Sequence, residues 1–508
     1  MSTRSALSNR LVQVYSIDAT ATAIWDRGRE WTWGHIATTR AAIDAELAQL
    51  GVDGPGVVGI VLRTRFAPVA AQLAALAGGH TIYALSPMMG DERLAADIAT
   101  APLDLVLAED EDWRRPGIAA ACERVGARGL ALWPDEKTAL SPVVAGGPRA
   151  LTRDATVATY MLTSGTTGTP KRIPITYGAL ENMLRAVRHY SPATRDAQDG
   201  DRLHRRPVVI ASPLVHSSGF GGVLRAVAEA RPLALLERFE PQAWTRLVET
   251  HQPRVTALPP TALRMLLDAG IEPARLASLR AIVVGSAPLS PELAEEFERT
   301  YGIVLLPNYG ATEFPGGLAG WTLADRREFG ATKRTSVGRP HPGVELRVVD
   351  PATGTVLGAG VTGLLEVRTP ATRRTGNDGW VTTTDLASLD DDGFLYIHGR
   401  ADEAIIRGGF KVIPREIEEL LEQHPAVVTA AVYGRPDERL GAVPVAAVET
   451  RAPVQPDELT AWLRERLAAY QVPVELHVLP ELPRTPSMKV SKPALRALID
   501  EQNPEQAR

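Results

Sequence analysis

Short apolar runs that end at turn residues alternate with Ala- and Leu-rich stretches as far as about residue 340. The runs have the length of buried strands, and the stretches between them have the residue spacing of helices. This alternation is typical of α/β proteins, in which parallel strands are buried on both faces of a sheet. The clearest expected strands are Val57–Leu62, Leu103–Leu107, Val208–Ala211 and Ala281–Val284, and the clearest expected helix is Leu180–Tyr190.

The pattern changes in the last third of the chain. Shorter expected strands are separated there by turn-rich segments, and they lie at Glu345–Val349, Gly363–Val367, Val427–Tyr433 and Val443–Val448. The first two indicate a β-rich insert, and the last two, with helical patterns around them, indicate a compact α+β unit. A chain of 508 residues exceeds the usual length of one domain. We therefore predict two domains, residues 1–399 and 400–508.

The composition excludes several classes of protein. A formal net charge of −5 gives no electrostatic reason to expect nucleic acid or an anionic membrane as a partner. The single cysteine, Cys122, excludes an intramolecular disulfide framework and suits a reducing compartment. The amino terminus lacks the apolar core of a signal peptide, and Ala67–Leu85 has the pattern of a helix and a strand rather than a membrane span. We expect a cytoplasmic monomer or homodimer.

The segment Tyr160–Pro174, YMLTSGTTGTPKRIP, carries the most information about chemistry. Glycines let backbone N–H groups approach an anion closely, and the surrounding hydroxyls and lysine add donors, so this composition suits a triphosphate. The alternative is a surface loop rich in Gly and Thr. The candidate phosphate-binding residues are Thr163, Ser164, Gly165, Thr166, Thr167, Gly168 and Lys171.

The segment TSGTTGTPK resembles the phosphate-loop signature of the acyl-adenylate-forming (AMP-binding) superfamily, which includes acyl-CoA synthetases, luciferases and peptide-synthetase adenylation domains. Matching segments follow in the family's order from about residue 30 to about residue 495, so the resemblance covers nearly the whole chain. It implies an α/β fold with a large N-terminal region of two α/β subdomains plus a β-barrel, followed by a small mobile α+β C-terminal domain. It also implies ATP and Mg²⁺ as cofactors.

A second segment, Asn308–Glu313 (NYGATE), combines an aromatic ring, a hydroxyl and a carboxylate. The ring can stack on a base, the hydroxyl can donate to phosphate, and one carboxylate suffices for Mg²⁺ when phosphate oxygens and water complete its shell. A turn with a solvated glutamate is the alternative. The resemblance implies that Tyr309 packs on adenine, Thr312 contacts the α-phosphate, and Glu313 coordinates the metal.

The resemblance implies that the remaining nucleotide contacts come from a strand-to-helix turn, Gly285–Pro288, and from two residues at positions that the family uses for the ribose, Asp385 and Arg400. Turns of this kind lie at the carboxyl ends of strands, where α/β folds bind ligands. Besides the phosphate-binding residues given above, the candidate nucleotide-binding residues are Gly285, Ser286, Ala287, Pro288, Asn308, Tyr309, Gly310, Ala311, Thr312, Asp385, Arg400 and Lys489. In contrast, we interpret Asp390–Gly393 as an exposed hairpin turn.

The carboxyl-terminal part supplies the residues that the family uses for catalysis and movement. Lys489, in PRTPSMKVSKPAL, occupies the position of the family's catalytic lysine, and Lys492 is the alternative. Met488 stands where the family usually has Gly, which bears on how Lys489 approaches the substrate. The resemblance also places the interdomain hinge at Asp402 and the tunnel for coenzyme A at Gly408 and Gly409.

The acid pocket is the least determined part. His216 lies at a position that the family places at the pocket mouth, although a structural role is an equal alternative. The further pocket candidates are Phe220, Ala257, Gly310, Gly316, Gly317 and Leu318. Most are small, so an aromatic, alicyclic or medium-chain acid would fit.

The resemblance implies an ATP-dependent ligase that converts a carboxylic acid to an acyl-adenylate with release of pyrophosphate. In that reaction Lys489, Thr312 and Glu313 are the catalytic candidates. Coenzyme A is the expected acceptor, an amine is the main alternative, and a carrier protein is the third. A nucleotide-binding regulator without catalysis is disfavoured, because all the matching charged residues are present.

Overall fold

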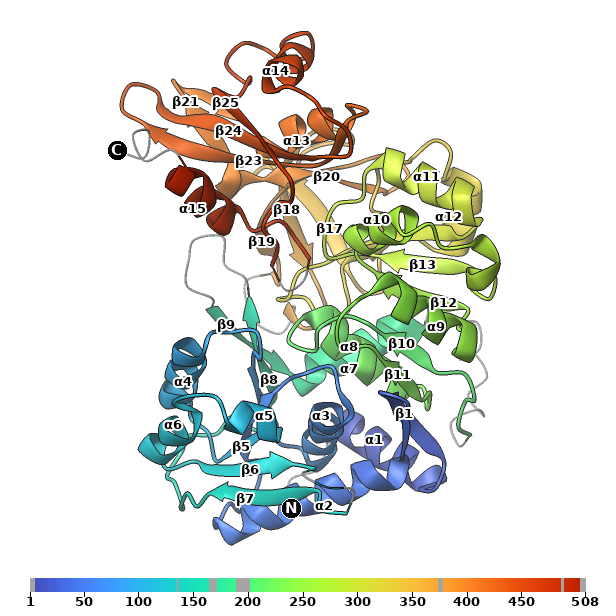
Figure 1. Ribbon diagram of the computed structural model, residues 1–508, viewed down its shortest axis with the longest axis vertical. Coiled ribbons are helices and arrows are strands. Elements are labelled where there is room, and N and C mark those ends of the chain that lie inside the picture. Colours follow the sequence, from blue (N-terminus) through green and yellow to red (C-terminus); the bar gives the residue numbers. More distant parts are fainter. Residues whose placement is uncertain are drawn as a thin grey trace.

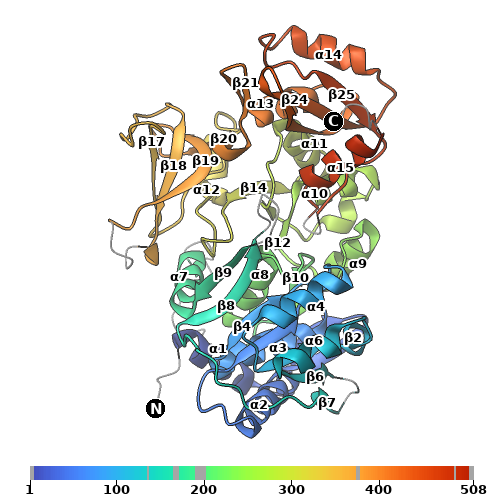
Figure 2. The same ribbon diagram turned by 90° about the vertical axis from the view of Figure 1, so that its left-hand side faces the viewer.

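The structure is a computed structural model that describes residues 5–133, 135, 137–163, 171–188, 202–372, 378–485 and 488–502. The molecule is elongated (Figure 1). The first 180 residues lie at one end of the long axis, and the residues after 400 lie at the other (Figure 2).

The first sheet occupies the N-terminal end. Its strand order is β7 (Leu140–Val144), β6 (Arg128–Leu132), β5 (Leu105–Ala108), β3 (Val57–Val61), β4 (Thr81–Leu85), β8 (Val157–Thr163) and β9 (Lys171–Thr176). The inner strands pair in parallel, and β7 and β9 are antiparallel at the edges. This arrangement confirms the expected α/β class.

Helices cover both faces of this sheet because successive side chains of its strands point in opposite directions. On β3, Val58 and Ile60 belong to the core under α1 (Ala6–Ile17), α2 (Trp33–Gln49) and α3 (Phe66–Gly78). Val57 and Val61 belong to the core under α4 (Asp91–Thr100) and α6 (Ile118–Val125). The stretch Ala67–Leu85 thus forms α3 and β4, as the sequence predicts.

A second α/β unit follows. Its sheet has the order β12 (Val255–Leu258), β13 (Ala281–Val284), β14 (Val304–Tyr309), β15 (Ala319–Gly320) and β16 (Arg339–Pro340), and β12 to β14 are parallel. Its core contains side chains from α9 (Pro241–His251), α10 (Pro260–Asp268) and α11 (Pro291–Tyr301). A smaller sheet joins the two units, with the order β10 (Val208–Ile210), β11 (Leu233–Leu235), β1 (Thr22–Asp26) and β2 (Arg29–Thr32). Helices α7 (Tyr177–Arg188) and α8 (Ser217–Ala228) lie between the first sheet and the second unit.

The expected β-rich insert is an antiparallel sheet of β17 (Glu345–Val349), β18 (Gly363–Arg368), β19 (Val381–Leu389) and β20 (Leu395–Arg400). The strand pairings of the described residues give an open sheet here, and they do not show the expected barrel. The segment Asp390–Gly393 connects β19 to β20, which confirms the predicted hairpin turn. Lys333 forms ion pairs with Asp390 and Asp392 in this turn.

The last unit is α+β, as predicted. Its sheet contains β22 (Phe410–Val412), β21 (Ile405–Arg407), β24 (Gly441–Thr450), β23 (Val427–Asp437) and β25 (Glu475–Leu479). Helices α13 (Pro414–Glu422) and α14 (Pro456–Arg464) pack on one face, and α15 (Lys492–Gln502) packs on the other through Leu495 and Ile499. No helix in the described ranges is both long and apolar enough to cross a membrane.

Candidate active site

Two adjacent strands of the second sheet deliver the nucleotide-binding candidates to one place. Strands β13 and β14 are parallel, so the turns that follow them, Gly285–Pro288 and Gly310–Glu313, emerge at the same edge. A Cβ atom on Gly285 would lie 3.2 Å from the carbonyl oxygen of Asn308, so glycine lets the two strand ends approach closely. Ser286 has a φ of +71°, a conformation that few non-glycine residues adopt. Both turns line one cleft.

The ribose-binding candidates lie opposite these turns. Asp385 in β19 pairs with Arg400 in β20, and the Tyr309 hydroxyl donates a hydrogen bond to the Asp385 carboxylate. Burial raises the pKa of Asp385, against the opposing effects of the Tyr309 hydrogen bond and the Arg400 charge. Burial and the neighbouring Asp385 carboxylate also raise the pKa of Tyr309, so its hydroxyl remains a donor at neutral pH. The Tyr309 hydroxyl therefore binds one carboxylate oxygen of Asp385, and the carboxylate still lines the cleft.

The proposed hinge residue is bound to a ribose candidate. Asp402 accepts hydrogen bonds from Nε and Nη2 of Arg400 at 2.9 and 2.8 Å. This paired contact raises the pKa of Arg400. The chain passes from one sheet to another at the same point, because residue 400 ends β20 and residue 405 begins β21.

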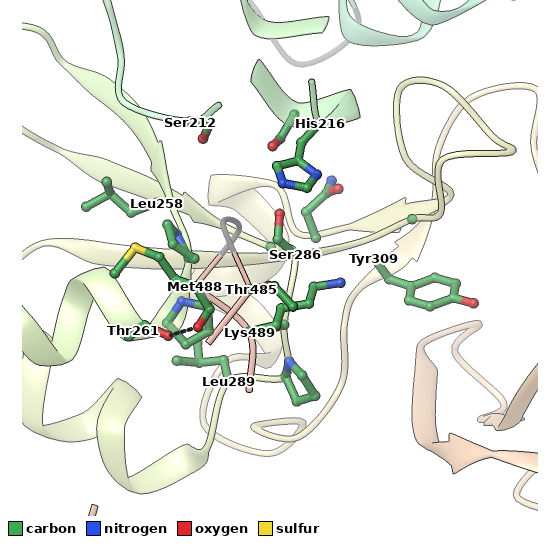
Figure 3. A pocket seen from close by; sticks show the side chains of 18 of the residues that line it. Ser212, His216, Leu258, Thr261, Ser286, Leu289, Tyr309, Thr485, Met488 and Lys489 are labelled. Carbon is green, nitrogen blue, oxygen red and sulfur yellow. Dashed lines mark hydrogen bonds between the residues drawn. The ribbon is translucent and has the colours of Figure 1, made fainter. Parts of the chain in front are cut away.

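Lys489 reaches the same cleft from the carboxyl-terminal unit. It lies in the segment between β25 and α15, and its ammonium points toward Tyr309 in Figure 3. The side chain remains open to the cleft, yet the surrounding protein and the Arg400 charge lower the pKa of its ammonium, while Asp385 opposes this effect. Lys492 is placed differently, because it forms ion pairs with Glu403 at 2.7 Å and Glu418 at 3.0 Å.

His216 stands at the amino-terminal end of α8 and lines the cleft. Its Nε2 atom has no hydrogen-bond partner among the described residues. Burial, with a smaller effect of the Lys489 charge, lowers the pKa of His216 to about 4. The imidazole is therefore neutral at physiological pH. Phe220 is placed differently from our expectation: its side chain is 1% exposed and lies in the N-terminal core, because helix α8 turns it away from the cleft.

The structure reveals pocket residues that the sequence analysis missed. A Cβ atom on Gly316 would lie 2.7 Å from Cγ of Met183, and one on Gly221 would lie 3.3 Å from its sulfur. Met183 thus packs between α8 and the loop after β14. His341 is a second addition, since its Nε2 lies 3.0 Å from Nδ2 of Asn308. No sequence pattern marks either residue as part of the pocket, because its place there depends on how its element packs against the others.

Several predicted residues lie elsewhere or outside the described part. Residues 164–170, which include Ser164, Gly165, Thr166, Thr167 and Gly168, are outside the described ranges, as are the side chains of Thr163 and Lys171. Thr163 and Lys171, which flank residues 164–170, pair at the ends of β8 and β9. Gly408 and Gly409 form the turn between β21 and β22 and do not line the cleft.

The chain is similar to proteins of known family. Residues 11–375 match the family described as AMP-binding enzyme, and residues 416–489 match the AMP-binding enzyme C-terminal domain. The chain belongs to the AMP-binding enzyme family. The match confirms the resemblance on which the nucleotide-binding candidates were chosen.

Curated relatives of this AMP-binding enzyme include a 2-succinylbenzoate–CoA ligase of Bacillus velezensis, which is 34% identical over 67% of this chain and 69% of the relative. A 4-coumarate–CoA ligase-like protein of Oryza sativa is 31% identical over 69% of this chain and 63% of that protein. Among solved structures, the o-succinylbenzoate CoA synthetase of Bacillus subtilis with its acyl-adenylate intermediate has a TM-score of 0.77 and 25% identity over 97% of both chains. The amide bond synthetase McbA of Marinactinospora thermotolerans has a TM-score of 0.80 and 26% identity over 97% of this chain and 99% of the other.

The residues present in this AMP-binding enzyme fit Mg²⁺ bound together with a nucleotide. The described part contains no group of three or more His, Cys, Asp or Glu side chains arranged to hold a metal by themselves. Glu313 is exposed and lines the cleft beside Thr312. Magnesium prefers one or two protein carboxylates with phosphate oxygens and water, so a single carboxylate here is the expected donor set.

Proposed function

We propose that this AMP-binding enzyme is a carboxylic acid–CoA ligase that works through an acyl-adenylate. The observation that carries the proposal is the placement of the Lys489 ammonium in the same cleft as Asp385 and the turns after β13 and β14. That placement requires the carboxyl-terminal unit to close over the strand ends. The CoA ligases among its relatives support the reaction class.

In the first half-reaction, an oxygen of the substrate carboxylate attacks the α-phosphorus of ATP. The bond from that phosphorus to the bridging oxygen breaks, and pyrophosphate leaves. Lys489 stabilises the negative charge that develops on the α-phosphate oxygens, and Thr312 donates a hydrogen bond to the same group. Bound Mg²⁺, held by Glu313, would neutralise the charge on the phosphates. Tyr309, Asp385 and Arg400 hold the adenosine in place.

In the second half-reaction, the thiol sulfur of coenzyme A attacks the acyl carbon. The bond from that carbon to the AMP oxygen breaks, the thiol proton passes to solvent, and AMP leaves. We propose that domains 1–399 and 400–508 rotate about Asp402 between the two steps. The change of sheet between residues 400 and 405 supports this boundary. Rotation would withdraw Lys489 and bring the Gly408–Gly409 turn toward the cleft.

We propose an aromatic acid as the substrate, with alicyclic and medium-chain acids as the alternatives. A side chain at Gly221 or Gly316 would run into Met183, and one at Gly317 would run into Asn308 and His341, so glycine lets the chain pack closely along this part of the cleft wall. Both curated relatives are named for acids that contain a benzene ring, 2-succinylbenzoate and 4-coumarate. The neutral His216 can form a hydrogen bond with the substrate. Because it carries no positive charge, it does not compete with Lys489 for the substrate carboxylate.

The test is pyrophosphate release over a panel of acids, measured with CoA, with amines and with neither. We expect acid-dependent release and a product whose mass is that of the acyl-CoA thioester. An amide product instead would support the second candidate, an amide synthetase, which the similarity to McbA favours. Absence of acid-dependent release over the whole panel would contradict the proposed adenylation.

A further inference from the structure

Met488, directly before Lys489, has an unusual backbone. Its φ is +66°, in the left-handed region that favours glycine. This conformation explains why glycine suits the position, since a Cβ atom there crowds the following carbonyl oxygen. A methionine in the left-handed region requires contacts elsewhere that hold it.

The side chain of Met488 provides such a contact. It is partly buried and packs against a core cluster whose other members all lie between Trp25 and Leu305, so a residue of the carboxyl-terminal unit covers the core of the second α/β unit. Figure 3 shows the sulfur of Met488 directed toward Leu258 at the end of β12, while the ammonium of Lys489 points the opposite way. The left-handed backbone thus directs two neighbouring side chains to opposite sides.

Hydrogen bonds hold the same backbone. The Met488 carbonyl accepts one from Oγ1 of Thr261 in α10 at 3.2 Å and one from Nη1 of Arg484 at 3.3 Å. The Met488 amide donates to the Thr485 carbonyl at 2.8 Å, and the Thr485 amide donates to the Lys489 carbonyl at 2.7 Å. The segment that carries Lys489 therefore forms hydrogen bonds within itself and one hydrogen bond with α10.

We propose that Met488 is a positioning residue that docks the carboxyl-terminal unit on the second α/β unit and so places Lys489 for adenylation. This inference rests on the proposed function of Lys489. The packing of Met488 on this core and its hydrogen bond with Thr261 exist only while the two units are docked in this arrangement, so they stabilise the adenylation state selectively. Any rotation that withdraws Lys489 must also pull Met488 out of the core.

Two substitutions separate the side chain from the backbone. Met488→Gly removes the apolar contact and relieves the left-handed strain, whereas Met488→Ala removes most of the contact and keeps the strain. If docking through the side chain matters, both variants lose adenylation. If only the backbone conformation matters, Met488→Gly retains full activity. Thr261→Val is the matched control for the hydrogen bond, because it preserves the shape of the side chain.

The experiment measures acid-dependent exchange of labelled pyrophosphate into ATP, transfer from supplied acyl-adenylate, and hydrogen–deuterium exchange of α10 without substrates. We expect exchange to fall about tenfold in both Met488 variants, which is the effect of losing one partly buried apolar contact. Transfer should be unchanged or faster, and deuterium uptake in α10 should increase. Thr261→Val should also slow pyrophosphate exchange and increase deuterium uptake in α10, but by less than the Met488 variants.

Wild-type pyrophosphate exchange by Met488→Gly, equal loss of both half-reactions, or unchanged α10 protection would each overturn the docking role. If the wild-type protein shows no acid-dependent exchange, the proposed function fails, and α10 protection in the variants still decides whether Met488 docks the two units. A thermal transition measured alongside separates these outcomes from unfolding.

Discussion

The Tyr309 hydroxyl donates a hydrogen bond to the Asp385 carboxylate, which joins the end of β14 to the middle of the β17–β20 sheet. The two residues belong to different sheets and lie 76 positions apart in the chain. The contact fixes the carboxylate before any nucleotide arrives, because the hydroxyl occupies one of its oxygens. Preorganisation of this kind lowers the entropy lost when the ribose binds.

We predict that Tyr309→Phe raises the KM for ATP while leaving the fold intact. A hydrogen bond to a charged group contributes about 1.5–3 kcal/mol, so an increase of roughly ten- to a hundredfold is expected. The measurement is initial rate against ATP and against 2′-deoxyATP. If Tyr309 orients Asp385 toward the ribose, the variant should discriminate less between the two nucleotides. Unchanged discrimination would mean that the hydroxyl has only a structural role.

Lys489→Ala should abolish formation of the acyl-adenylate and spare transfer from supplied acyl-adenylate. Its charge acts while pyrophosphate leaves, and loss of one such contact costs about 3–4 kcal/mol, or 10²–10³ in rate. Lys492→Ala is the matched control. Because Lys492 forms ion pairs with Glu403 and Glu418, its loss should lower the melting temperature and leave the adenylation rate nearly unchanged. A severe defect in Lys492→Ala with a mild one in Lys489→Ala would reverse the assignment.

Glu313→Gln should raise the Mg²⁺ concentration needed for half-maximal adenylation. The substitution keeps the shape of the side chain and removes the charge of one oxygen ligand. Rates are measured over a Mg²⁺ titration at fixed ATP. Because Glu313 is exposed, the melting temperature should remain that of the wild type. Wild-type activity at limiting Mg²⁺ would exclude Glu313 as a ligand.

Asp402→Pro should separate the two half-reactions. Proline fixes φ near −65° and removes the backbone N–H, so the rotation that we propose at this residue would be blocked. We expect retained pyrophosphate exchange and loss of acyl transfer. Asp402→Ala, which removes the ion pair with Arg400 but leaves the backbone free, is the control and should keep both steps. Equal loss of both steps in a folded proline variant would contradict the hinge.

His341 should make the protein less stable in mild acid. Burial lowers the pKa of His341 from 6.5 to about 4, so below pH 6.5 the unfolded state binds a proton that the folded state rejects. This group's stabilisation is complete above pH 6.5 and declines as pH falls toward 4. The loss should reach about 2 kcal/mol at pH 5. Free energies of unfolding at pH 7 and pH 5, in the wild type and in His341→Gln, test this: the variant should lose less.

Much of this protein could be predicted from local pattern. The uninterrupted apolar strands β3 and β13 indicated buried parallel sheets, because only strands covered on both faces lack polar positions. The turn at Gly285–Pro288 was predicted to lie at the carboxyl end of a strand, where α/β folds bind ligands. These features depend on residues close together in the chain, which is why local pattern determined the fold class. The set of nucleotide-binding candidates followed from short motifs that resemble those of the family.

Tertiary structure decided which way individual side chains point. Phe220 lies in a motif that suggested a pocket wall, yet packing of α8 against the first α/β unit places it in the core. Met183 and His341 line the cleft although nothing nearby in the sequence marks them. Met488 shows the same dependence, because its left-handed backbone is held by Thr261, more than two hundred residues away. Such contacts join residues that are far apart in the chain. They form and stabilise the protein only when it folds, so no local or periodic pattern in the sequence predicts them.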